Sequence, residues 1–125
     1  MIVLRNKIKT LPWTKENVDK YKNPSNLLKH ARTGEGIEGI ILVSSGRNSL
    51  IGYIAWEGDY IVAFEVAQGE RGKGYGEKLL SIALENGCKR LSVRKDNTAA
   101  INLYHKFGFK EGRDLGKIMI EMEKL

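Results

Sequence analysis

Residues 70–77 read ERGKGYGE, with glycine at 72, 74 and 76 and cations at Arg71 and Lys73. The stretch follows the apolar run YIVAFEVA (60–67) and leads into GEKLLSIALENG (76–87), where apolar residues recur at helical spacing. A glycine-rich turn between a strand and a helix presents unpaired backbone N–H groups at the positive end of the helix dipole. Without side chains, glycines let an anion approach the backbone closely. The stretch therefore predicts a phosphate-binding turn.

Two common phosphate motifs do not fit this turn. A Walker A loop needs four residues between its glycines and then Lys with Ser or Thr, which GKGYGEK (72–78) lacks. The dinucleotide fingerprint G-x-G-x-x-G begins at Gly72 and Gly74, but Glu77 stands where its third glycine is required. Asp96 lies at the distance expected of the ribose-binding acid of such folds. However, the sequence shows only one strand–helix–strand unit, and these folds are built from a doubled arrangement. A different phosphate ligand is indicated.

The composition predicts one domain over residues 1–125, because 125 residues that are 42% hydrophobic suit a single core with a ligand cleft. The sequence has no apolar run long enough to cross a membrane and no signal-peptide pattern. We expect a soluble cytoplasmic protein with no membrane partner. Cys88 is the single cysteine and has no metal-ligand pattern around it, so we expect a plain thiol and no metal site.

The formal charge of +6 favours anionic partners. The cations are scattered along the chain without a dense block, and they are not interleaved with aromatic residues. This arrangement gives no support to a nucleic-acid module and fits a phosphate-rich small molecule.

The order of elements predicts an α/β fold. The stretch MIVLR (1–5) favours a short strand, and the polar stretch 10–33, broken by Pro12 and Pro24, one or two short helices. Three apolar runs then predict an antiparallel meander of strands at 37–45, 49–57 and 60–67. After the glycine turn come a helix capped by Gly87, a strand at 90–95, a helix at 97–108, and two strands at 109–112 and 117–125. Together they predict a mixed sheet with helices on both faces.

Two motifs in this order carry a family resemblance. Residues 71–76 (RGKGYG) match R/Q-x-x-G-x-G/A, and residues 93–112 (VRKDNTAAINLYHKFGFKEG) contain an Asn that opens a helix with Leu-Tyr and ends at Gly-Phe. The matching positions of the second motif are Asn97, Leu103, Tyr104, Gly108 and Phe109. Both resemble signatures of the GCN5-related N-acetyltransferase (GNAT) superfamily, the first being its acetyl-CoA pyrophosphate loop.

This resemblance implies the element order β-α-α-β-β-β-α-β-α-β-β, with the sheet splayed between the fourth and fifth strands. It implies acetyl-CoA as cosubstrate, and transfer of the acetyl group to an amine, from a small molecule or a peptide, by direct attack in a ternary complex. The backbone N–H of Val66 would polarise the thioester carbonyl. The resemblance implies that the following residues contact the cosubstrate: Val66, Ala67, Arg71, Gly72, Lys73, Gly74, Tyr75, Gly76, Asn97 and Tyr104. A monomer and a homodimer both remain open.

Tyr104 matches the family position of the general acid. A tyrosine of pKa about 10 can donate a proton to a thiolate whose conjugate acid is near about 8.5. The alternative is a core aromatic, because Tyr104 shares helical spacing with Ala100 and Ile101. Asn97 has an alternative role as the N-cap of the same helix.

The proton acceptor and the amine site are less determined. Glu65 is the only carboxylate inside the strand 60–67, but strict alternation points it away from the face of Val66 unless a bulge intervenes. Glu57, Asp59, Tyr60 and a water chain are alternatives. Aromatic and basic residues of the first segment are candidates for acceptor binding, namely Trp13, Tyr21, His30 and Arg32. A catalytically idle module that binds CoA or a protein partner is the alternative function.

Overall fold

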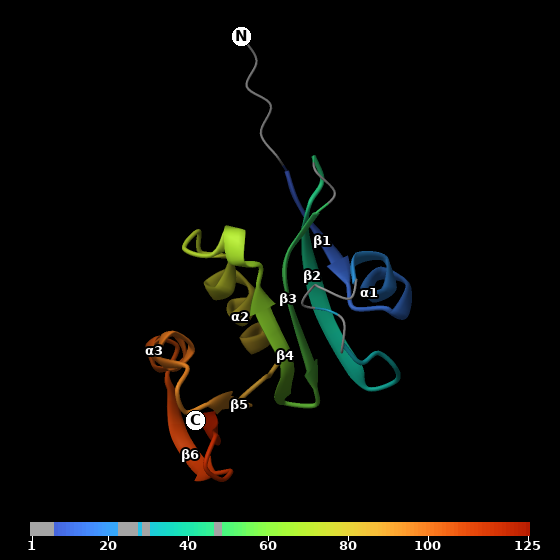
Figure 1. Cartoon of the computed structure of the whole chain (residues 1–125). Coiled ribbons are helices and arrows are strands. Elements are labelled where there is room, and N and C mark those ends of the chain that lie inside the picture. Colours follow the sequence, from blue (N-terminus) through green and yellow to red (C-terminus); the bar gives the residue numbers. More distant parts are fainter. Residues whose placement is uncertain (1–6, 23–27, 29–30, 47–48) are drawn as a thin grey trace.

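The computed structural model describes residues 7–22, 28, 31–46 and 49–125. Within this part of the chain, seven strands form one mixed sheet in the order β1-β2-β3-β4-β5-β7-β6 (Figure 1). Helix α1 lies on one face of the sheet, and α2 and α3 lie on the other. None of the helices described is long and apolar enough to cross a membrane. The α/β class and the placement of helices on both faces are confirmed.

The N-terminal segment differs from the prediction. The expected strand 1–5 lies outside the described residues, and the first strand, β1, is Ile8–Pro12, overlapping the stretch expected to be helical. It pairs antiparallel with β2 along the edge of the sheet, where a terminal Pro12 without an N–H is tolerated. Helix α1 (Lys15–Tyr21) follows, capped by Thr14. A second helix before residue 33 would fall largely on residues outside those described.

The meander is confirmed. Strands β2 (Ile37–Ser44), β3 (Ser49–Glu57) and β4 (Tyr60–Val66) pair antiparallel in sequence order. The β3–β4 register shifts between Ala55 and Trp56, which leaves Val62 of β4 without a partner, a β-bulge.

The C-terminal half follows the predicted order. After the short 3₁₀ helix η1 (Gln68–Glu70) come α2 (Tyr75–Glu85), β5 (Arg90–Arg94) and α3 (Thr98–Lys106). The hairpin of β6 (Phe109–Asp114) and β7 (Met119–Lys124) closes the sheet. Gly87 follows α2 at φ +88°, and its N–H donates to the carbonyl of Leu84, as expected of a C-terminal cap.

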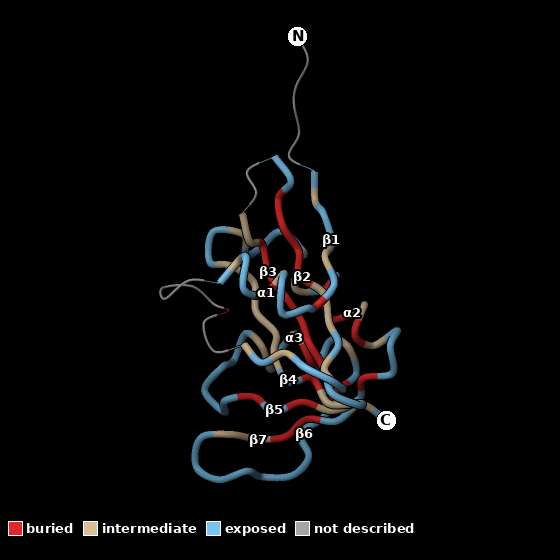
Figure 2. Tube along the Cα trace, turned by 90° about the vertical axis from the view of Figure 1, so that its right-hand side faces the viewer, coloured by how far each residue is buried: buried red, intermediate tan, exposed pale blue. Residues whose placement is uncertain are grey.

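Two hydrophobic layers cover the sheet. Ile54 and Trp56 of β3 pack with α2 and α3 on one face, whereas Tyr53 and Ala55 pack with Trp13 and α1 on the other. Figure 2 shows buried stretches along β2 and β3 and on parts of β5 and β7. Trp56 is 5% exposed and belongs to the core on the α2 side.

The splay between β4 and β5 is present. Among the described residues, these parallel strands pair at Tyr60↔Arg90 and Ile61↔Leu91, and beyond Ile61 they continue without a ladder. The C-terminal half of β4 therefore has one hydrogen-bonding edge turned toward a gap in the sheet.

Candidate functional site

The glycine turn between β4 and α2 adopts a backbone that requires glycine. Gly72 has φ +78°, and Gly74, the N-cap of α2, has φ +87°. A Cβ at either position would meet nothing within 4 Å, so conformation and not lack of space selects glycine here.

The N-terminus of α2 offers several N–H donors. The first helical bond runs from the Lys78 N–H to the Gly74 carbonyl at 3.1 Å, and no side chain caps the helix. The amides of residues 75–77 are therefore left without helical acceptors, at the positive end of an 11-residue helix. Such amides can hold an anion, which is the role that the sequence predicts for this turn.

The charged side chains of the turn are held by local contacts. Arg71 folds back, and its Nε donates to the carbonyl of Val66 at 3.1 Å. Lys73 pairs with Glu70 at 3.0 Å, and its side chain is 54% exposed. Glu77 in the first turn of α2 pairs with Lys106 at 2.6 Å, so Arg71 and Lys73 against Glu70 leave the net charge beside the helix terminus positive.

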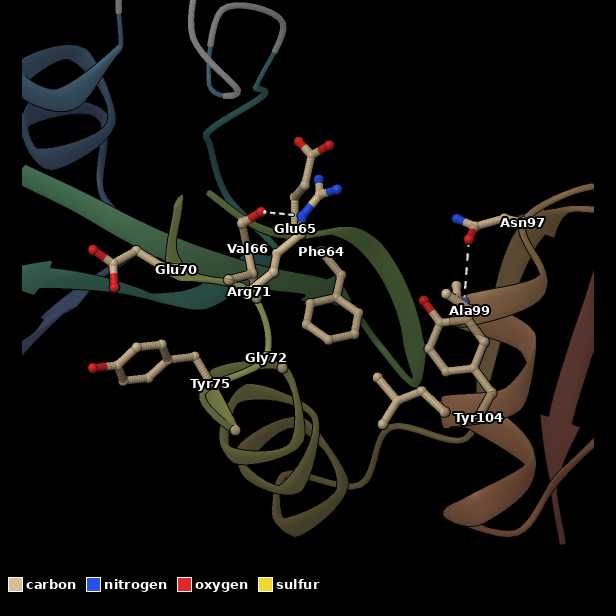
Figure 3. A pocket seen from close by; sticks show the side chains of 14 residues that line it. Phe64, Glu65, Val66, Glu70, Arg71, Gly72, Tyr75, Asn97, Ala99 and Tyr104 are labelled. Carbon is tan, nitrogen blue, oxygen red and sulfur yellow. Dashed lines mark hydrogen bonds between the residues drawn. The ribbon is translucent and has the colours of Figure 1, made fainter. Parts of the chain in front are cut away.

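A cavity of about 410 Å³ lies between this turn and the start of α3 (Figure 3). All the predicted site residues line it except Ala67 and Lys73. The N–H of Ala67 donates to Ile51, and its carbonyl accepts from Glu70, so both of its backbone groups already have partners.

The prediction missed other residues that line the cavity: Phe64, Glu70, Ala99, Ala100 and Leu103. The signal for two of these was available. Phe64 lies two residues before Val66 and hence on the same face of the strand. Ala100 lies one helical turn before Tyr104, although this spacing was taken as evidence for a core role.

Tyr104 belongs to both the core and the cavity. It is 7% exposed and packs against Phe64 and Phe109, with ring centroids 6.3 and 5.9 Å away. Among the described residues its hydroxyl has no hydrogen-bond partner. Burial raises the pKa of Tyr104 to about 12, so the hydroxyl is a proton donor throughout the physiological range.

Asn97 caps α3, as the alternative interpretation expected. Its side-chain oxygen accepts from the N–H of Ala100 at 3.1 Å. Because the residue also lines the cavity, its side-chain NH₂ remains available to a ligand. Capping and ligand contact are thus compatible.

The two residues at the end of β4 point in opposite directions. The side chain of Val66 packs on the α2 side, whereas Glu65 accepts a hydrogen bond of 3.3 Å from the Tyr53 hydroxyl on the α1 side. Figure 3 shows Glu65 directed away from the gap between Phe64 and Tyr104. Burial, and then the charge of Glu65, raise the pKa of Tyr53. The alternation expected from the sequence is confirmed, and the bulge at Val62 does not alter it.

The backbone of Val66 is turned toward the gap. Its neighbour Ala67 donates its N–H to Ile51 of β3. Successive N–H groups of a strand point to opposite edges, so the N–H of Val66 points away from β3 and toward the splay. A backbone donor therefore faces the gap at the position where the family resemblance implies one.

A second cavity, of about 310 Å³, lies between residues of β4 and β5 and shares Phe64 and Tyr104 with the first. Arg32, Tyr60, Val62, Ser92 and other residues of β4 and β5 line it. The indole N–H of Trp13 donates to the Arg32 carbonyl at 2.9 Å and so anchors the segment that carries Arg32.

Two other candidates for acceptor binding, Trp13 and Tyr21, line neither cavity. Trp13 is buried in the α1-side core, Tyr21 packs against it, and His30 lies outside the described residues.

Cys88 is buried, and burial raises its pKa to about 11, which fits an inert thiol. In the described part of the chain, no group of three His, Cys, Asp or Glu could hold a metal ion.

Comparison with known proteins assigns the chain to a family. The model of the Acetyltransferase (GNAT) family matches residues 4–109. No curated protein sequence matches the chain.

Solved structures share the fold. PH1933 from Pyrococcus horikoshii OT3 is 28% identical over 69% of this chain and 63% of its own, with a TM-score of 0.62. NAA60 from Arabidopsis thaliana, solved with acetyl-CoA, is 16% identical over 93% of this chain and 97% of its own, with a TM-score of 0.67. The PaiA N-acetyltransferase from Thermoplasma acidophilum, solved with coenzyme A, is 23% identical over 72% and 62%, with a TM-score of 0.59.

This chain therefore spans less than two thirds of the Pyrococcus and Thermoplasma proteins. The family model nevertheless covers most of it, and the splayed sheet with its glycine turn agrees with that match. The chain belongs to the acetyltransferase (GNAT) family.

Proposed function

We propose that this protein transfers the acetyl group of acetyl-CoA to a primary amine of a small molecule or peptide while both are bound. The observation that carries the proposal is the meeting of two cavities at Phe64 and Tyr104. One cavity ends at an anion-binding turn and suits the cosubstrate, and the other suits the acceptor. The acetyl-CoA and coenzyme A complexes of the Arabidopsis and Thermoplasma proteins support this assignment.

The first cavity fits the cosubstrate at both ends. The amides of residues 75–77, with Arg71 and Lys73, would hold the pyrophosphate. A Cβ on Gly76 would lie 3.8 Å from Val66 and Leu103 and would fill the space between α2 and α3. Asn97 faces the same space from α3. The N–H of Val66 would bind the pantetheine arm or the thioester oxygen, whereas Ala67 has no free backbone group for it.

Tyr104 would act on the leaving sulfur. Its pKa of about 12 exceeds the value of about 8.5 typical of a thiol, so complete proton transfer to the free thiolate would cost about 5 kcal/mol. We therefore assign Tyr104 a hydrogen bond that strengthens as charge develops on sulfur. Burial makes the energetic mismatch larger than the sequence suggested.

Glu65 remains one candidate for the proton acceptor. It lines the first cavity, but its carboxylate is engaged by Tyr53, and it does not line the second. Among the strand residues of β4 it is the only carboxylate. The engagement of the Glu65 carboxylate by Tyr53 also favours a second candidate function, a CoA-binding module without catalysis.

Two measurements test the proposal in sequence. Calorimetric titration should give saturable acetyl-CoA binding in the range of tens of micromolar or tighter, and its absence would remove the proposal altogether. A screen of polyamines, aminoglycosides, amino acids and peptides, followed by free-thiol release, should then find an acceptor. Binding without thiol release from any of these amines would favour the non-catalytic module.

A further inference from the structure

A buried carboxylate adjoins the second cavity from a strand that the sequence did not connect with catalysis. Within the described residues, Ser44 and Glu121 are the two polar residues that are buried. Glu121 lies on β7, and its side chain is 11% exposed. A buried carboxylate is costly unless it is hydrogen-bonded or paired, so its partners carry information.

The partner of Glu121 is a residue of the cavity wall. The hydroxyl of Tyr60 donates to Glu121 Oε2 at 3.2 Å, although 61 residues separate them in sequence. Tyr60 lines the second cavity, as does Ser92. Ser92 pairs with Glu121 across β5 and β7, so their side chains lie on the same face of the sheet.

The surrounding charges hold this arrangement. Arg90 lies over the Tyr60 ring at 5.4 Å and is held by Asp59 at 2.9 Å. Arg113 of β6 approaches Glu121 to 3.9 Å, and Arg32 faces the cavity from the opposite side. Glu123 of β7 adds a second negative charge near Arg90. Asp59, one alternative proton acceptor, is thus committed to Arg90.

We propose that Tyr60 receives the proton of the acceptor amine and passes its own proton to Glu121. This inference rests on the proposed function, because it makes the second cavity the amine site. Tyr60 is the group that touches the amine, and Glu121 is a positioning residue that acts through it. The pair thus provides a carboxylate that can take up the proton near the second cavity, where β4 contributes none.

The step balances without a further reactant. The acceptor enters as its ammonium ion and gives one proton to the Tyr60 oxygen, while the Tyr60 proton moves to Glu121 Oε2. The neutral nitrogen then forms a bond to the acetyl carbon and loses a second proton to solvent. The C–S bond breaks, its electron pair stays on sulfur, and a proton from solvent completes the free thiol. Glu121 afterwards returns its proton to solvent. The cavity, with room for about ten water molecules by volume, holds a small amine group beside Tyr60.

Two conservative variants test the pair. Glu121→Gln keeps an oxygen that can accept from Tyr60 but removes the charge, and Tyr60→Phe keeps the ring. Each should lower kcat roughly tenfold or more, with unchanged acetyl-CoA affinity. Their activity should recover as the pH is raised and the amine loses its proton unaided, which a purely structural loss would not do. Glu85→Gln, at the exposed end of α2 and outside both cavity linings, is the matched control and should behave as the wild type.

Ethylamine is the probe, because it has one primary amine and little else. On the acetyl-CoA-loaded protein, ethylammonium should shift the NMR resonances of the Tyr60 ring. Glu121→Gln should weaken this effect at least about threefold. In Tyr60→Phe, the same weakening should be seen at the resonances of Ser92, which lines the same cavity, and thermal melts should show each variant folded. Absence of the shift in the wild type would overturn the inference, as would wild-type rates and pH profiles in both variants. The inference would also be overturned if, among the carboxylate variants, only Glu65→Gln lost the dependence of kcat on pH. Failure of acetyl-CoA to bind at all would instead refute the proposed function.

Discussion

The rings of Phe64 and Tyr104 lie 6.3 Å apart between centroids, and both residues line both cavities (Figure 3). One residue comes from β4 and the other from α3, on either side of the splay. This contact lies where the cavity beside the glycine turn meets the cavity that Tyr60 lines. Acetyl transfer, as proposed, takes place beside it.

Replacing Tyr104 with Phe should separate catalysis from binding. The aromatic contacts with Phe64 and Phe109 are kept and only the hydroxyl is lost, so we expect kcat to fall by about ten- to a hundredfold. The affinity for acetyl-CoA should change by less than about twofold, because the interaction develops only in the transition state. Steady-state kinetics and calorimetry measure the two effects. An unchanged kcat would leave Tyr104 as a core residue.

The same substitution should change stability in alkali. The pKa of Tyr104 is about 12 in the folded protein against 10.0 ordinarily, so the unfolded chain loses this proton first. The contribution is complete below pH 10.0 and is lost as the pH rises toward about 12, by roughly 2 to 3 kcal/mol in total. The wild type should therefore lose stability faster than Tyr104→Phe between about pH 10 and 12. Urea unfolding at several pH values checks this, and parallel curves would contradict it.

Gly76→Ala should weaken acetyl-CoA binding without unfolding the protein. The added Cβ would lie at ordinary contact distances of 3.8 to 3.9 Å from Leu103, Val66 and Phe64, inside the first cavity. We expect affinity to fall about tenfold or more, with a melting temperature equal to or above that of the wild type, since alanine favours the helix. Gly69→Ala is the matched control, because its Cβ would meet nothing within 4 Å and the residue lies outside the cavity lining. Equal affinities in the two variants would argue against the pyrophosphate assignment.

A pair of substitutions can separate the two roles of Asn97, capping of α3 and contact with the cosubstrate. Asn97→Ala removes the cap on the Ala100 N–H and should cost about 1 kcal/mol of stability. Asn97→Ser restores a capping oxygen but not the side-chain NH₂. If the amide contacts the cosubstrate, stability recovers in the Ser variant while acetyl-CoA affinity remains reduced about threefold or more. Recovery of both would limit Asn97 to capping.

Local patterns in the sequence were sufficient for much of the fold. The strand at 49–57 and the helix that Asn97 caps were predicted from alternation, helical spacing and capping residues, which depend on neighbours within a few positions. The first strand was misplaced, because the sequence at 8–12 has only a weak pattern and its strand forms by pairing with Ile40 to Ser44.

The candidate site divides in the same way. The turn from Arg71 to Gly76 and the motif around Tyr104 could be identified from the sequence alone, because backbone conformation and helix capping are local properties. Three contacts join residues from different elements: the hydrogen bond of Tyr60 with Glu121, the hydrogen bond of Tyr53 with Glu65, and the packing of Phe64 on Tyr104. Sheet order and the splay of β4 from β5 bring these side chains together, and packing across the whole chain, which no local pattern encodes, decides both.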